Sequence, residues 1–375
     1  MNNFNKKIKL MEPLLGREEL AAVHQVLESG VISAGEKGVM FGNMVAAYAG
    51  CEYGVAVSNC TAALHIALMV LGIGPGDEVM IPDYTHPATA MAVVAVGADP
   101  VLVDVDPVTF TLDFDKVLGG MSKRTKAIIP VSLFGYPVDI ERYIELKNRF
   151  GVYVIEDAAC SLGGIFNGVP SGSLADISCF SFHPRKIITS GEGGVLVTNN
   201  SAWAEKAKAI RQFGAVSVPG TTRMSFQWAG LNYKLSDVLA AIGLAQMEKL
   251  PRILEERRAK AKIYDAFLAG REGVIAPPYV GAGVVHTYQT YCCLLHEDTN
   301  RDELLLDLAA EGIECQIGTY SLHLQPYFSS LKRHGILGNS ASAFSRSIAL
   351  PLHSNLTLCE QERVCSALRV HLAVK

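Results

Sequence analysis

Lys186 lies in an unusual setting for a lysine. The segment FSFHPRKIITSGEGG (180–194) surrounds it with Phe182, Ile187 and Ile188, and three of the four residues at 191–194 are glycines. Burial lowers the pKa of a lysine because it disfavours the charged form. The neutral amine is then available as a nucleophile toward a carbonyl group. The alternative is a lysine at a strand end whose ammonium group reaches the solvent beside a glycine turn.

Two other positions could do chemistry together with such an amine. The segment SNCT (58–61) follows an apolar run and precedes a helical pattern, so free backbone N–H groups there would favour an anion such as a phosphate. Asp157 ends the apolar run VYVIED, where a carboxylate could stabilise a buried cation. Each position also has a simpler explanation, since Ser58 or Thr61 could cap the helix and Asp157 could cap the segment AACSLGG.

Together, the three features match the requirements of one cofactor, pyridoxal 5′-phosphate. Its phosphate needs a helix N-terminus, its aldehyde needs an amine, and its pyridinium nitrogen needs a carboxylate partner. The glycines after Lys186 would let the backbone approach such a ligand closely. The chain has neither a G-x-x-x-x-G-K-[ST] loop nor a strand-linked G-x-G-x-x-G motif, which argues against phosphoryl transfer and dinucleotide redox chemistry.

The elements that must position these residues follow a repeating pattern between residues 53 and 200. Short apolar runs alternate with helical stretches, and the runs are nearly continuously apolar. Such strands are typical of a sheet covered on both faces, and therefore of an α/β fold with mostly parallel strands. Ligands bind beyond the carboxyl ends of these strands, where all three candidate positions fall. We expect strands at 53–58, 78–82, 100–105, 126–133 and 152–157.

After residue 200 the pattern changes. We expect a helix near 202–213, a loop at about 214–230, and a long helical stretch at 235–268 in which Pro251 causes a kink or a break. Further along, YQTYCCLLH is predicted as a strand and DELLLDLAAEG as a helix that ends at Gly312.

These patterns predict two domains. The large domain covers residues 1–250 and includes an N-terminal helical segment, and the small C-terminal domain covers residues 251–375.

Composition limits the classes of protein to which the chain can belong. It has 375 residues, 49% of them hydrophobic and 19% charged, with a net charge of −4, so it can bury a large core. No basic cluster has the density that nucleic acid binding needs. We expect no membrane span and no signal peptide, because the uncharged stretches are interrupted and the basic N-terminus lacks an apolar core. Nine cysteines without a Cys-x-x-Cys spacing favour reduced thiols, no metal site and a cytoplasmic location.

Several motifs, in their order along the chain, resemble those of one known family. The segments SNCTAALHIALMVLGIGPGDEVMIPDYTHPATA, IEDAACSLGG, FSFHPRKIITSGEGGVLVTNN and GLNYKLSDVLAAIGLAQMEKL are similar to motifs of the sugar-nucleotide aminotransferases. These are the DegT/StrS class of fold-type-I pyridoxal-phosphate enzymes, and the similarity covers nearly the whole chain. It implies an aspartate-aminotransferase-like α/β fold, with a large, mostly parallel seven-stranded sheet domain and a small α+β C-terminal domain.

The resemblance implies a catalytic pair and a phosphate site. Lys186 would bond covalently to the cofactor and move protons during the reaction. Asp157 would pair with the pyridinium nitrogen. Cys60 and Thr61, with the hydroxyl of Ser181, would hold the phosphate.

The resemblance also implies contacts around the cofactor. His86 would stack on the cofactor ring, and Asn232 would reach the phosphate of the neighbouring subunit, so that a homodimer would share its active sites. Apart from the resemblance, Arg223 in the loop at about 214–230, together with Tyr320 and His323, is a candidate to contact the substrate, because a diphosphate would need cations there. A lone arginine in a loop can also be simply solvated.

The chain departs from many relatives at two positions. Cys60 stands where many relatives have glycine, and Cys160 stands where they often have glutamine or histidine. Because a thiol contacts the cofactor more weakly than those side chains, we do not expect Cys160 to belong to the site.

The reaction implied by the resemblance is a transamination in two halves. L-Glutamate would donate its amino group and leave pyridoxamine 5′-phosphate, and the keto-sugar of a nucleotide-linked sugar would then accept the amine. Two alternatives remain open from the sequence. The acceptor could be a keto-cyclitol, or the chain could be a non-catalytic regulator that binds pyridoxal phosphate.

Overall fold

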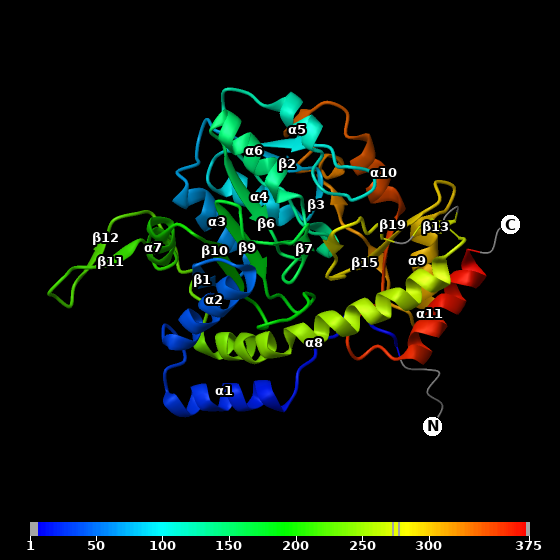
Figure 1. The fold of residues 1–375 in the computed structure, drawn as a ribbon, viewed down its shortest axis with the longest axis horizontal. Coiled ribbons are helices and arrows are strands. Elements are labelled where there is room, and N and C mark those ends of the chain that lie inside the picture. Colours follow the sequence, from blue (N-terminus) through cyan, green and yellow to red (C-terminus); the bar gives the residue numbers. More distant parts are fainter. Residues whose placement is uncertain (1–6, 272–273, 277, 373–375) are drawn as a thin grey trace.

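The computed structural model describes residues 7–271, 274–276 and 278–372. A large sheet forms its centre, with the strand order β1-β10-β9-β6-β5-β2-β4-β18 (Figure 1). Paired strands are parallel except at β10, which runs antiparallel to both β1 and β9. These strands are β1 (Tyr53–Val57), β2 (Glu78–Pro82), β4 (Asp99–Val103), β5 (Thr125–Ile128), β6 (Tyr153–Asp157), β9 (Ile177–Ser181), β10 (Gly194–Thr198) and β18 (Lys332–His334).

Seven of these strands lie between residues 53 and 198, and the eighth comes from the C-terminal part of the chain. β18 pairs in parallel with β4 at the edge of the sheet. The ammonium group of Lys332 in β18 lies 2.6 Å from the buried carboxylate of Glu78 in β2. The predicted sheet of seven mostly parallel strands is therefore present and is extended by one short strand.

Both faces of the large sheet are covered, which explains the continuously apolar strands. In β2, Val79 and Ile81 face one hydrophobic core, while Met80 between them faces another, and all three are fully buried. The covering helices are α2 (Glu36–Ala49), α3 (Cys60–Val70), α4 (Pro87–Ala95), α5 (Phe114–Gly120), α6 (Ile140–Phe150) and α7 (Ser201–Ile210).

The longest helix, α8 (Asp237–Leu268), connects the large sheet to the C-terminal part (Figure 1). Of the predicted kink or break at Pro251, the break is wrong, because the helix continues through this residue. Apolar residues on both sides of the proline are buried, in different cores: Leu250 and Leu254 pack beneath the large sheet, and Tyr264 packs in the C-terminal core. This burial outweighs the hydrogen bond that a proline removes from a helix.

The C-terminal part has its own antiparallel sheet, with the strand order β13-β15-β19-β16. Helices α9 (Arg301–Ala310) and α11 (Leu358–His371) pack with it around a separate hydrophobic core. Its strands are β13 (Ile275–Ala276), β15 (Tyr291–Leu295), β16 (Gln316–Ile317) and β19 (Ser347–Leu350). The separate core agrees with a small domain, but the division at residue 250 stays a prediction.

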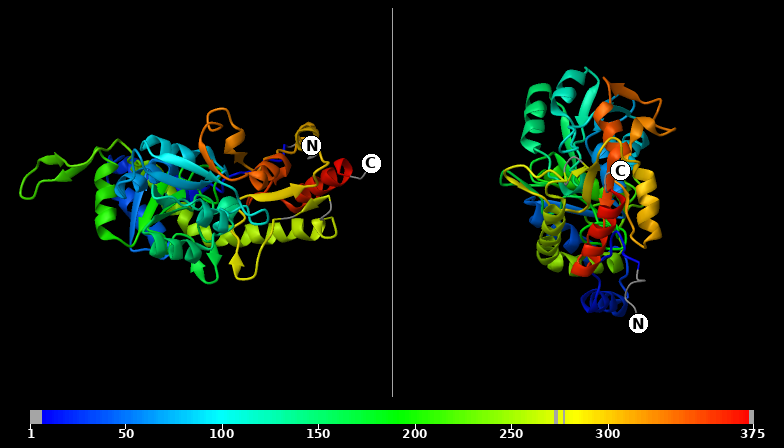
Figure 2. Two further views of the ribbon diagram at one scale, coloured as in Figure 1. Left: turned by 90° about the horizontal axis from the view of Figure 1, so that it is seen from above. Right: turned by 90° about the vertical axis from the view of Figure 1, so that its right-hand side faces the viewer.

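The remaining elements lie around these two sheets (Figures 1 and 2). The segment predicted as a loop at 214–230 contains a hairpin, β11–β12, that extends away from the body of the molecule (Figure 1). No helix of the described residues is long and apolar enough to span a membrane. These elements are α1 (Arg17–Ser29), α10 (Gly338–Arg346), β3 (Tyr84–Thr85) with β17 (Tyr320–Ser321), β7 (Ile165–Phe166) with β8 (Val169–Pro170) and β14 (Val284–Val285), β11 (Ala215–Ser217), β12 (Met224–Phe226), and 3-10 turns at Leu133–Gly135 and Leu322–Leu324.

Candidate active site

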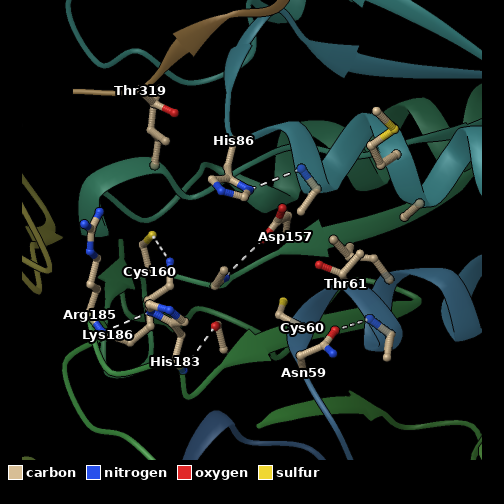
Figure 3. A pocket seen from close by; sticks show the side chains of 18 of the residues that line it. Asn59, Cys60, Thr61, His86, Asp157, Cys160, His183, Arg185, Lys186 and Thr319 are labelled. Carbon is tan, nitrogen blue, oxygen red and sulfur yellow. Dashed lines mark hydrogen bonds between the residues drawn. The ribbon is translucent and has the colours of Figure 1, made fainter. Parts of the chain in front are cut away.

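A cavity of about 930 Å³ lies at the carboxyl ends of the parallel strands. β6 ends there at Asp157, and β9 ends there at Ser181. The structure thus brings together residues that are more than 120 positions apart in the sequence (Figure 3). Six residues that were predicted for the site line this cavity: Cys60, Thr61, His86, Asp157, Ser181 and Lys186.

One wall of the cavity is the N-terminus of α3. The capping residue is Asn59, whose Oδ1 accepts a hydrogen bond of 2.8 Å from the N–H of Ala62, so neither Ser58 nor Thr61 is the cap. The N–H groups of Cys60 and Thr61 have no protein acceptor in the described part of the chain. Two free N–H groups at the positive end of a helix form a site suited to a phosphate.

Gly194 allows strand β10 to pass directly beside this helix N-terminus. A Cβ atom at Gly194 would lie 2.4 Å from the backbone of Asn59 and 2.7 Å from the backbone nitrogen of Cys60. Gly194 is also paired with Ser181 across the two strands, which places the Ser181 hydroxyl at the same end of the cavity. The glycine therefore allows strand β10, and with it the paired Ser181, to lie close to the N–H groups at the start of helix α3.

Asp157 is buried at the floor of the cavity, with only 5% of its surface exposed. The Thr89 hydroxyl donates a hydrogen bond of 2.8 Å to its Oδ2, and the N–H of Ala159 donates one of 3.2 Å to its Oδ1. The hydrogen bond from Ala159 is the capping contact that the sequence suggested. The carboxylate of Asp157 is also buried and oriented by Thr89. A carboxylate held in this way can stabilise a cationic group in the cavity.

Lys186 is half-buried, and its ammonium group points to a thiol. Its Nζ donates a hydrogen bond of 3.1 Å to Sγ of Cys160 (Figure 3). Burial lowers the pKa of Lys186, but Cys160, Cys60 and Asp157 outweigh it, and the pKa is raised above its ordinary value. The sequence-based expectation of a lowered pKa is therefore wrong for the chain by itself, because it considered the apolar neighbours in sequence and not the acidic groups in space.

His86 lines the cavity and caps helix α4. Its Nδ1 accepts a hydrogen bond of 3.2 Å from the N–H of Ala88. Burial lowers the pKa of His86, and the charge of Lys186 lowers it further. The imidazole is therefore a neutral, flat ring at neutral pH, as a residue that stacks on a cofactor should be.

Sequence reasoning missed several residues that line the cavity. Cys160 was left out, yet it contacts Lys186. His65 and Tyr233 meet at the helix α3 end of the cavity, with 2.8 Å between Nδ1 and the phenol oxygen. The other missed residues include His183 and Arg185, whose closeness to Lys186 in sequence could have indicated them. They also include Gln289, Thr290 and Thr319, which come from segments distant in sequence.

The segment 286–290 supports the loop that carries Lys186. The amide of Gln289 donates a hydrogen bond of 2.8 Å to the carbonyl of Arg185, and the Thr287 hydroxyl donates one of 2.9 Å to the carbonyl of Cys160. The buried guanidinium of Arg257 in α8 donates in turn to the carbonyls of Tyr288 and Gln289. The C-terminal part thus fixes the backbone of Cys160, whose thiol contacts Lys186 Nζ, and the backbone of Arg185, which directly precedes Lys186.

Four of the predicted site residues do not line the cavity. Arg223 is exposed on the β11–β12 hairpin, and Asn232 is exposed with its Oδ1 accepting a hydrogen bond of 2.7 Å from Lys234. Tyr320 is partly exposed in β17. His323 is partly buried, and its Nδ1 lies 2.7 Å from Oδ2 of the buried Asp83. Within a single chain their predicted roles are untested and stay predictions.

The donor set of the cavity fits pyridoxal phosphate. The free N–H groups of Cys60 and Thr61 at the start of helix α3 suit the phosphate, and the carboxylate of Asp157 suits a protonated ring nitrogen. The amine of Lys186 can reach an aldehyde in the same cavity, and His86 offers a flat neutral ring. Among the described residues, no group of three or more His, Cys, Asp or Glu side chains could hold a metal ion.

Comparisons with known proteins show relatives that match nearly the whole chain. The GDP-perosamine synthase of Caulobacter vibrioides is 37% identical over 365 residues, which cover 96% of this chain and 97% of that protein. DesV of S. venezuelae, solved in complex with a ketimine intermediate, is 30% identical with a TM-score of 0.92, covering 99% of this chain and 100% of that one.

A further solved structure is that of the putative sugar aminotransferase Spr1654 of Streptococcus pneumoniae. Its PLP form is 26% identical with a TM-score of 0.91, covering 98% of this chain and 99% of that chain, and a PMP form has also been solved. The expected aspartate-aminotransferase-like fold is confirmed. Residues 13–369 match the DegT/DnrJ/EryC1/StrS aminotransferase family, and the chain belongs to this family.

Proposed function

We propose that the chain is a pyridoxal-phosphate-dependent aminotransferase that transfers the amino group of L-glutamate to the keto-sugar of a nucleotide-linked sugar. The observation that carries this proposal is the meeting of Lys186, Asp157 and the free N-terminus of α3 in one cavity. The similarity to GDP-perosamine synthase and to sugar aminotransferases supports a sugar nucleotide as the acceptor.

Lys186 is the group that moves protons. The bound cofactor supplies a ring that accepts the electron pair left when the α-proton of the donor is removed. Lys186 Nζ would take this proton from the α-carbon of the donor and return it to the carbon bonded on the other side of the amine nitrogen. Lys186 Nζ would reverse these steps with the acceptor. Proton transfer by a positioned side chain contributes about 10²–10⁴-fold in rate. When its amine is free, Cys160 Sγ holds it by the 3.1 Å hydrogen bond.

Asp157 holds the proton on the ring nitrogen. Its carboxylate is oriented by Thr89 and Ala159, so little reorganisation is needed when charge moves into the ring. The N–H groups of Cys60 and Thr61 orient the cofactor by its phosphate. His86 keeps the ring in place by contact with its face.

The protein is proposed to act as a homodimer with shared active sites. Phe226 at the end of β12, and Trp228 and Leu231 after it, are exposed apolar side chains that precede the exposed Asn232 in the chain. Exposed apolar patches are typical of protein interfaces. Asn232 would reach the phosphate of the partner's cofactor, and Arg223 would reach its substrate.

All nine cysteines are free thiols, in agreement with a cytoplasmic location.

The function is tested with purified protein loaded with pyridoxal phosphate. We expect L-glutamate to bleach the visible absorption band of the lysine-bound cofactor, with one equivalent of 2-oxoglutarate formed. Keto-sugar nucleotides are then screened for recovery of the band. Recovery with a keto-cyclitol alone would contradict the proposed acceptor, and bleaching without recovery by any ketone would favour a non-catalytic binding protein.

The shared site is tested by mixing two inactive variants. Lys186→Ala and Asn232→Ala chains combined should regain activity in mixed dimers, because one of the two sites then contains both native residues. Failure to regain activity in dimers of proven mixed composition would contradict the role of Asn232.

A further inference from the structure

Arg185 directly precedes Lys186 and lies at the edge of the same cavity (Figure 3). Its Nη1 donates a hydrogen bond of 2.9 Å to the side-chain oxygen of Gln316 in β16. Within the described residues, no carboxylate lies at ion-pairing distance from its guanidinium group. A guanidinium has five N–H donors, and most of those of Arg185 are therefore available to a ligand.

The backbone of Arg185 is fixed although its side chain is exposed. Its carbonyl accepts a hydrogen bond of 2.8 Å from Gln289, and its N–H donates one of 3.1 Å to Nδ1 of His183. The contact with Gln316 directs the head group toward the C-terminal sheet. Few rotamers remain to be lost when a ligand binds, so the cost of ordering this side chain is small.

A second, smaller cavity of about 100 Å³ opens beside Arg185. Arg185, Gln289, Thr290 and Gly318 border both cavities, so the two are neighbours. The polar side of the smaller cavity comprises Arg185, Gln289, Thr290 and Gln316. Its apolar side comprises Leu10, Met11, Ile317, Ala349, Leu350 and Leu352.

This lining suits a short aliphatic arm that ends in a carboxylate. The apolar side can contact methylene groups, while the planar guanidinium can bind both oxygens of a carboxylate. The amide of Gln316 accepts from Arg185 through its oxygen and has its nitrogen left to donate to the same carboxylate. A volume of about 100 Å³ has room for such an arm but not for a sugar ring with its nucleotide.

We propose that Arg185 binds the side-chain carboxylate of the amino donor while the donor's α-amino group reacts beside Lys186. Arg185 thereby selects a dicarboxylic amino acid over a donor without a second carboxylate. Gln316 is the positioning residue for the guanidinium. This inference rests on the proposed transamination and adds the residue that determines which donor is used.

The first experiment measures donor use by the cofactor-loaded protein. The rate of bleaching of the visible band is followed against the concentration of L-glutamate and of L-alanine, for wild type, Arg185→Gln, Arg185→Lys and the control Arg252→Gln. Arg252 is exposed on α8, pairs with Glu256 and lines neither cavity. We expect Arg185→Gln to raise the half-saturating concentration of L-glutamate about 10- to 100-fold and to leave that of L-alanine unchanged.

The second experiment measures binding without reaction. Glutarate has two carboxylates and no amine, and butyrate has one carboxylate on a similar chain. Calorimetry on the cofactor-loaded protein should show that glutarate binds wild type more tightly than butyrate does, and that Arg185→Gln removes this difference. Arg185→Lys should give an intermediate result, because it keeps the charge and loses the planar fork.

The outcomes separate this inference from the proposed function. Two results would overturn the role of Arg185 if wild type reacts with L-glutamate. Arg185→Gln could leave the half-saturating concentration of L-glutamate unchanged, or it could raise the half-saturating concentrations of L-alanine and L-glutamate equally. The role of Arg185 is also overturned if Arg185→Gln reacts normally with L-glutamate but has a raised half-saturating concentration of the sugar nucleotide. If wild type reacts with no amino donor, the proposed function itself fails.

Discussion

Replacing Gly194 by alanine should disrupt the phosphate site selectively. The new Cβ would lie 2.4 Å from the carbonyl of Asn59 and 2.7 Å from the nitrogen of Cys60, whereas ordinary van der Waals contact begins at 3.4 Å. Strand β10 and the start of helix α3 must therefore separate by about 1 Å. Both elements are anchored in the core, so the movement falls on the N–H groups of Cys60 and Thr61.

The size of the effect follows from this movement. Overpacking of a well-packed region costs about 1–3 kcal/mol of folding stability. Hydrogen bonds to a charged phosphate are worth about 1.5–3 kcal/mol, and a free-energy loss in this range corresponds to about 10- to 100-fold weaker binding. We therefore expect Gly194→Ala to weaken pyridoxal phosphate binding about 10- to 100-fold.

The assay is a titration of cofactor-free protein with pyridoxal phosphate, followed by its absorption. Urea unfolding of the same samples without cofactor gives the stability change. The matched control is Gly74→Ala, where the nearest heavy atom to the new Cβ is 3.7 Å away and no strain arises. Wild-type affinity in Gly194→Ala, with its lowered stability confirmed, would refute the assignment of the helix α3 N-terminus as the phosphate site.

Three further predictions concern single side chains around the site. Cys160→Ala should lower the pKa of Lys186, because Cys160 raises it. Cofactor attachment should then reach half its maximum at a lower pH than in wild type. An unchanged midpoint would contradict an effect of Cys160 on Lys186. Burial raises the pKa of Glu156 to about 7, so the folded chain binds a proton that the unfolded chain releases above about pH 4.5. The free energy of unfolding should therefore fall by about 3 kcal/mol between about pH 4.5 and 7, and Glu156→Gln should remove this fall in urea titrations. Thr89→Val removes the 2.8 Å hydrogen bond to Asp157 and should slow the glutamate half-reaction about 10-fold with little loss of cofactor, whereas unchanged single-turnover kinetics would show that this hydrogen bond does not matter.

The sequence was sufficient for the sheet and for the half of the site that the sheet carries. Strands buried on both faces are continuously apolar, so they could be recognised, and the ends of parallel strands meet at one edge. Asp157 and the start of helix α3 were predicted to be close for this reason alone. Lys186 was identified because a lysine among apolar residues is unusual.

The other half of the site depends on contacts that no local pattern encodes. Gln289 and Thr290 reach the cavity because α8 continues through Pro251 and the C-terminal part packs against the large sheet. The raised pKa of Lys186 arises from Cys160, which is 26 positions away in sequence and 3.1 Å away in space. Local patterns also favoured the wrong cap for α3, because Ser58 and Thr61 are also common capping residues.

The central claim is that Lys186 is the amine that carries the reaction. The most direct test compares the absorption spectra of wild type and Lys186→Ala, each loaded with pyridoxal phosphate, before and after L-glutamate is added. We predict that wild type shows a visible band that glutamate bleaches with formation of 2-oxoglutarate, and that Lys186→Ala forms no lysine-bound cofactor and releases no 2-oxoglutarate. Equal bleaching and equal 2-oxoglutarate in both proteins would contradict the account.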